Sequence, residues 1–148
     1  MNYAHNVIVT VFAKETENSE EVLKGLKLLF PFDLLKEKIN VKQETATGIN
    51  ENKIIIYTVK FTKTRHITEF LQNLIKQLGP AQIKTLMEQK ESRLDQDRIF
   101  YIRLDKKELI NQKYKLTDKG DCYHIKMHIA AYPAKREPAL EIIEKIFK

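Results

Sequence analysis

Cysteine is almost absent from this sequence, which contains one, Cys122. A single cysteine excludes an internal disulfide framework and predicts a reducing compartment, so we expect a cytoplasmic protein. We interpret Cys122, which lies in a β-rich stretch, as a packing or surface residue rather than as a catalytic thiol. Long hydrophobic runs are also missing. Because no apolar stretch approaches the roughly 20 residues that cross a bilayer, we expect no membrane span.

Glycine is scarce as well. The four glycines are scattered, which excludes a glycine-rich phosphate-binding loop. Gly/Ser-rich linkers, internal repeats and low-complexity segments are also lacking, and 148 residues suit one domain with a buried core. We therefore predict a single domain over residues 1–148. Its first residues lack a basic region and alternate as a strand does, so we expect them to belong to the fold rather than to a signal peptide.

Positive charge, in contrast, is abundant and concentrated. The net charge is +6, and residues 98–136 hold ten basic and four acidic side chains, an excess equal to that of the whole chain. A segregated basic patch attracts polyanions. The alternative is a basic surface that serves only solubility.

Hydrophobic periodicity predicts strands at residues 5–13, 39–48, 52–62 and 98–104. It predicts helices at 19–30, with Asn18 or Ser19 as the cap, and at 64–80, ended by Gly79 and Pro80. A short helix around residue 86 and a last helix over 134–147 follow. We predict a hairpin of residues 111–116 with 122–132, turning at 117–121.

These elements predict an α+β fold of two layers, an antiparallel sheet with helices on one face. Each strand has an apolar side for the helices and a side rich in basic, hydroxyl and aromatic groups. Such a face is suited to phosphates, 2′-hydroxyls and stacked bases. Its expected members are Thr58, Lys60, Tyr101, Arg103, His124, Lys126 and His128.

Catalytic patterns are weak. Four residues of strand separate His124 from His128 by about 13 Å, too far to bind one metal. Asp95, Asp97 and Asp105 are candidate Mg²⁺ ligands of a nuclease, but a polar turn before a strand and the end of that strand explain them more simply. We predict a protein that is not an enzyme, with no cofactor and no metal.

Near the C-terminus, "AAYPAKREPALEII" places Lys135 and Arg136 at the start of a helix, where the dipole disfavours cations. Two explanations remain open. The pair holds an anion such as an RNA phosphate together with the helix N–H groups. Alternatively, Arg136 binds an acidic neighbour, Asp105 or Glu137, and fixes the last helix to the sheet.

The stretches "DQDRIFYIRLDKKEL" and "KLTDKGDCYHIKMHIAAYPAKRE", with the helix after them, resemble an archaeal RNA-binding family described as a predicted exosome subunit. The resemblance implies a fold like that of the large-subunit ribosomal protein that binds 5S rRNA, and RNA binding without catalysis in RNA processing or degradation. The expected partners are RNA and an exosome or another RNA-processing complex. The predicted RNA-binding residues are Lys60, Tyr101, Arg103, Lys106, Lys107, Lys113, Lys115, His124, Lys126, His128, Lys135 and Arg136.

Two other functions stay open. One is an assembly subunit whose basic face binds an acidic protein, and the other is a metal-dependent nuclease. The order of elements also fits an RRM, although "RIFYIRL" lacks the Gly-aromatic pattern of its RNA-binding strand.

Overall fold

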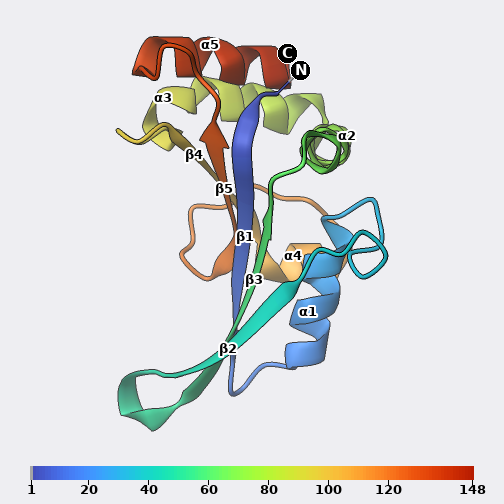
Figure 1. Cartoon of the computed structure of the whole chain (residues 1–148). Helices are drawn as coiled ribbons and strands as arrows, with labels where there is room; N and C mark the ends of the chain where they lie inside the picture. The colour runs from blue at the N-terminus through green and yellow to red at the C-terminus, as the bar shows by residue number, and fades with distance from the viewer. Residues whose placement is uncertain (1) are drawn as a thin grey trace.

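The computed structural model describes residues 2–148, which form an open sheet of five strands (Figure 1). The strands run in the order β2-β3-β1-β5-β4, and every neighbouring pair is antiparallel. Their bounds are β1 (Ala4–Lys14), β2 (Val41–Thr47), β3 (Lys53–Phe61), β4 (Ile99–Asp105) and β5 (Cys122–Ile129). The α+β architecture with an antiparallel sheet is therefore confirmed.

Helices α1, α2 and α4 lie on one side of this sheet, and α3 and α5 lie across one of its ends (Figure 1). At that end Phe147 of α5 contacts Phe100 of β4. Among residues 2–148, no helix is long and apolar enough to cross a membrane. The bounds are α1 (Ser19–Leu28), η1 (Ile49–Glu51), α2 (Thr64–Glu88), α3 (Lys90–Arg93), α4 (Lys106–Ile110) and α5 (Arg136–Phe147).

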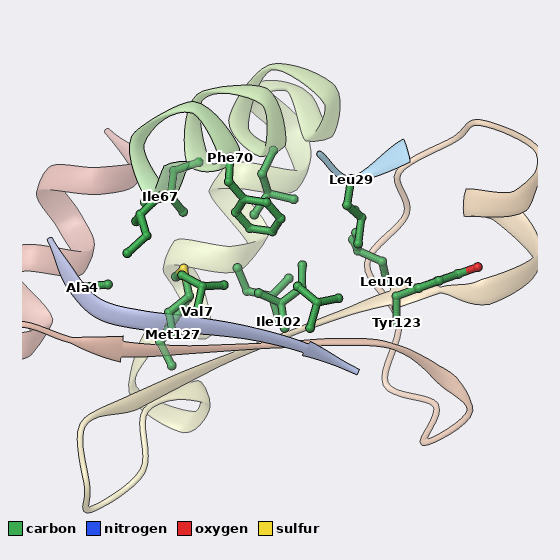
Figure 2. Packing of buried hydrophobic residues seen from close by; sticks show 14 of the residues in the cluster. Ala4, Val7, Leu29, Ile67, Phe70, Ile102, Leu104, Tyr123 and Met127 are labelled. Carbon is green, nitrogen blue, oxygen red and sulfur yellow. The ribbon is translucent and has the colours of Figure 1, made fainter. Parts of the chain in front are cut away.

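The core lies between the sheet and the helices. Alternate residues of β1, β3, β4 and β5 point into it, so Val7, Ile102 and Met127 are completely buried against α2 residues such as Phe70 (Figure 2). This period-two pattern is the reason the sequence predicted the strands. Tyr123 extends the core to α1, where its hydroxyl donates to the Val22 carbonyl at 2.6 Å.

Helix α2 bends at Gly79, where the sequence predicted that the helix would end. Gly79 has φ 79° and ψ 165°, a conformation that is open almost exclusively to glycine. The chain then continues as a helix through Pro80 to Glu88. The two limbs of α2 account for the long helix and the short helix expected from the sequence.

The predicted hairpin of residues 111–116 with β5 is wrong. Residues 115–117 instead lie along the outer edge of β4, where Leu116 bridges Leu104 and the Thr117 N–H donates to the Arg103 carbonyl at 3.0 Å. Gln82 of α2 fixes this segment, because its side chain bonds the Leu116 N–H and the Tyr114 carbonyl. Strand β5 is paired with β1 and β4 on its two edges.

Candidate nucleic-acid interface

The side of the sheet away from the helices is called the open face here. Its side chains alternate with the core residues of the same strands, and the register places them in rows across the sheet. One row runs from Thr58 through Thr10 and His124 to Arg103, and the next from Lys60 through Ile8 and Lys126 to Tyr101. The open face is defined as Ile8, Thr10, Phe12, Ile56, Thr58, Lys60, Tyr101, Arg103, His124, Lys126 and His128.

Three cations of the open face are not neutralised. In the described part of the chain, residues 2–148, Lys60, Lys126 and Arg103 have no carboxylate within 4 Å. Lys42 on β2 differs, since its ammonium lies 2.7 Å from Glu44. The positive charge therefore lies over β3, β5 and β4, where it is open to an anionic ligand.

Two contacts fix the ring of Tyr101 on the open face. Its ring stacks on the imidazole of His124, with centroids 5.4 Å apart and 20° between the planes. Its hydroxyl donates to Asp95 at 2.8 Å, and this hydrogen bond raises the pKa of Tyr101. Because these two contacts already fix the ring, it loses little conformational freedom when a ligand binds.

The histidines of the open face favour the neutral state. Partial burial, followed by the neighbouring charges of Lys126 and Arg103, lowers the pKa of His124. Burial and the adjacent His5 lower the pKa of His128. Among residues 2–148, His124 Nε2 is also the one buried side-chain nitrogen or oxygen without a hydrogen-bond partner.

Part of the open face is apolar. Phe12 is 45% exposed and lies opposite Ile56, with Ile8 and Thr10 further along β1. The sequence pattern predicted the polar residues of β3, β4 and β5 but gave no role to Phe12. An exposed aromatic ring is a platform on which a base can stack.

A hollow of about 470 Å³ lies where the open face meets the outer edge of β4. This β4 hollow is lined by Tyr101 and Arg103 of β4, by Gln89, Ser92 and Arg93 at the end of α2 and in α3, and by Thr117 and Asp118 of the edge segment. Sequence analysis missed Arg93, because it predicted no helix at residues 90–93. Partial burial lowers the pKa of Arg93, but a guanidinium remains charged at neutral pH.

Lys106, predicted to bind RNA, is buried. Its ammonium donates to the Phe12 carbonyl at 2.7 Å, to Glu17 at 3.0 Å and to Asp121 at 2.5 Å. All three donors of the ammonium are thereby occupied inside the chain. Lys106 therefore joins the ends of β1, α4 and β5, and the prediction of a surface ligand is corrected.

Arg136 is also occupied, although neither predicted explanation named its partners. Its guanidinium donates to the carbonyls of Leu94 at 2.9 Å and of Glu91 at 2.5 Å. The Lys90–Glu144 ion pair joins the same two helices, α3 and α5. Arg136 is a structural clamp, but it binds backbone carbonyls at the end of α3 rather than Asp105 or Glu137.

The remaining basic candidates lie away from the open face. Lys107 is exposed on α4, Lys113 and Lys115 are exposed on the segment after it, and Lys135 is exposed before α5. The last helix begins at Arg136, two residues later than predicted, and α4 was not predicted. These four lysines extend the positive field but do not form one site with Lys60 and Lys126.

The proposed nuclease carboxylates have structural roles. Asp95 accepts hydrogen bonds from the N–H groups of Asp97 and Ile99 and from Tyr101, and Asp105 caps α4 through the Glu108 N–H. Within residues 2–148, no three His, Cys, Asp or Glu side chains are grouped closely enough to hold a metal ion.

Comparison with known proteins assigns the chain to a family. A family model described as RNA binding matches residues 6–130, which include β2 to β5 and most of β1. The chain belongs to this RNA-binding family. Sequence comparison finds similarity to the RNA-binding protein PAB1135 of Pyrococcus abyssi. The two sequences are 29% identical over 142 residues, which are 96% of this chain and 92% of the relative.

Solved structures agree with the family assignment. Protein AF2318 from Archaeoglobus fulgidus superposes with a TM-score of 0.86 at 29% identity, covering 97% of this chain and 99% of that one. Mth689 from Methanothermobacter thermautotrophicus gives a TM-score of 0.80 at 27% identity, covering 99% and 100%. SSO0741 from Sulfolobus solfataricus, at 21% identity and a TM-score of 0.73, shares the fold over 95% and 98%.

Proposed function

We propose that the protein is a cytoplasmic, non-catalytic RNA-binding protein that holds RNA on the open face. The observation that carries the proposal is the group of cations Lys60, Lys126 and Arg103, which lie on the same face as Tyr101 and have no carboxylate within 4 Å among residues 2–148. Cations bind the phosphates, and the aromatic and hydroxyl groups contact bases and 2′-hydroxyls. Membership of the RNA-binding family supports the same assignment.

The proposal predicts a preference for single-stranded or irregular RNA over a DNA duplex. Side chains on a flat sheet reach poorly into a duplex groove, whereas unpaired bases can lie against the sheet. Fluorescence anisotropy with labelled RNA and a sequence-matched DNA duplex tests this. Affinity for RNA should fall by orders of magnitude between about 50 and 200 mM salt if six or more phosphates are contacted. Binding that does not change with salt, or equal affinity for the DNA duplex, would contradict the proposal.

We further propose that the protein acts as an accessory factor in RNA processing or degradation, in association with an exosome. A protein that binds RNA without cutting it contributes to these reactions by bringing RNA to an enzyme. Co-purification from its own cells, with and without nuclease treatment of the lysate, tests the association. Recovery of exosome subunits after nuclease treatment indicates direct contact, whereas their loss indicates that RNA alone connects them. Failure to recover them in either sample would reject this role.

A further inference from the structure

The β4 hollow presents both hydrogen-bond donors and acceptors on preformed walls. One wall is α3, which begins where α2 ends at Gln89. The other is the edge segment, which Gln82 and the β4 backbone hold through Leu116 and Thr117. A site between two fixed walls needs little rearrangement to bind a ligand.

Arg93 supplies donors whose orientation is fixed. Its Nε and Nη2 donate to Gln89 Oε1 at 3.0 and 2.6 Å, and its Nη1 donates to the Tyr101 carbonyl at 3.3 Å. A guanidinium has five N–H groups, so one on each terminal nitrogen remains for a ligand. Arg103 lies on the same hollow and uses Nη1 in a long 3.4 Å contact with the Asp118 carbonyl.

Acceptors lie on both walls of the hollow. Asp118 contributes an exposed carboxylate, and the Ser92 hydroxyl, which donates to the Gln89 carbonyl at 2.9 Å, keeps its lone pairs. A site for a bare phosphate would be weakened by a carboxylate on its wall. A ligand that carries acceptors on one edge and donors on another fits this arrangement better.

We propose that the β4 hollow binds an unpaired guanine of the RNA. Guanine presents two adjacent acceptors, N7 and O6, which match the paired donors of an arginine. Its other edge carries N1–H and the N2 amino group, which match the Asp118 carboxylate. Adenine has a donor in place of O6, so its edge opposes a guanidinium. The inference rests on the proposed RNA binding and adds a base preference to it.

Short oligouridines that contain a single guanosine, inosine or 7-deazaguanosine test the inference. One guanosine should raise affinity about tenfold over uridine, as expected for a good bidentate contact. Inosine lacks the N2 amino group and 7-deazaguanosine lacks N7, so each should lose most of this gain. Asp118→Asn should make guanosine and inosine equivalent, and Arg103→Lys, which keeps the charge, should reduce the guanosine preference.

Lys60→Gln is the matched control, because Lys60 lies on β3 across the sheet from the β4 hollow. It should weaken all the oligonucleotides equally. RNA binding that is steep in salt but indifferent to the base would overturn the guanine site and leave the proposed function intact. Failure of every RNA to bind would overturn both.

Titration of isotope-labelled protein with GMP, AMP and inorganic phosphate provides a second readout that does not require a bound RNA strand. Amide signals of Ser92, Thr117 and Asp118 should shift with GMP more than with AMP. Equal shifts with phosphate alone would mean that the hollow is a simple anion site, and would overturn the inference.

Discussion

The guanidinium of Arg136 shows how one side chain can be misassigned from its position in the sequence. Its place at the start of α5 predicted either an anion or an acidic side chain as its partner, whereas its hydrogen bonds go to the carbonyls of Glu91 and Leu94. The last carbonyls of a helix and the residues after it lack partners in the helix itself, and a cation satisfies them. The sequence contains no signal for this interaction, because the two segments are far apart along the chain and α3 was not predicted.

Replacing Arg136 therefore tests stability rather than binding. Arg136→Ala should lower the free energy of unfolding by about 1–2 kcal/mol, because two carbonyls lose a charged donor. RNA affinity of the folded protein should not change. Chemical denaturation and anisotropy measure the two effects, with Lys135→Ala as the neighbouring control that should leave stability within about 0.5 kcal/mol. Normal stability with weakened RNA binding would restore the phosphate-ligand assignment.

The pKa of His124 predicts opposite effects of pH on folding and on RNA binding. In the folded protein burial keeps this pKa below its ordinary value, so the unfolded chain binds the proton more readily. The stability contributed by the neutral imidazole is therefore present above about pH 6.5 and is lost as pH falls below it. RNA phosphates favour the charged imidazole, so affinity should rise over the same interval.

Denaturation and anisotropy between about pH 7.5 and 5.5 check both directions. His124→Gln, which cannot be protonated, should flatten a large part of each dependence, while the effect of His128 remains. An unchanged pH dependence of RNA affinity in His124→Gln would exclude His124 from the binding surface.

The bend in helix α2 predicts how a substitution at Gly79 changes stability. Gly79→Ala should cost roughly 1–3 kcal/mol, because φ 79° and ψ 165° are strained for any residue with a Cβ. Steric overlap is not the cause, since an added Cβ would meet nothing within 4 Å among residues 2–148. Gly120→Ala is the control, with equal space and no positive φ. Equal melting temperatures for both variants would contradict the strain argument.

Elements were predictable where one face of a segment is buried along its whole length. The alternation in β1, β3, β4 and β5 arises from burial against helices, so it is visible in the sequence and predicted the correct open face. Residues 111–117 failed this test, because their position depends on hydrogen bonds with distant segments, through Gln82 and the Tyr114 hydroxyl, and on the free edge of β4. The β4 hollow could not be predicted for the same reason, since the edge segment forms one of its walls.

At the scale of the whole molecule, RNA binding should depend more on where the positive charges lie than on how many there are. Lys60→Gln combined with Lys126→Gln should lower the salt slope of RNA binding by about two, roughly one for each phosphate that is no longer bound. Lys24→Gln with Lys84→Gln removes the same charge from exposed positions on α1 and α2. That control should leave the slope almost unchanged. Equal effects of the two pairs would mean that RNA responds to net charge alone.

Strand β1 has a consequence for the order in which the protein forms. It lies at the centre of the sheet, and its pairing with β5 sets Val7 opposite Met127. A ribosome releases β1 early and β5 much later, so the edge of β1 that pairs with β5 remains unpaired until β5 emerges. Pairing between such distant segments slows folding. The proposed RNA surface needs residues of β3, β4 and β5 side by side, so a nascent chain cannot complete this surface until β5 has been made.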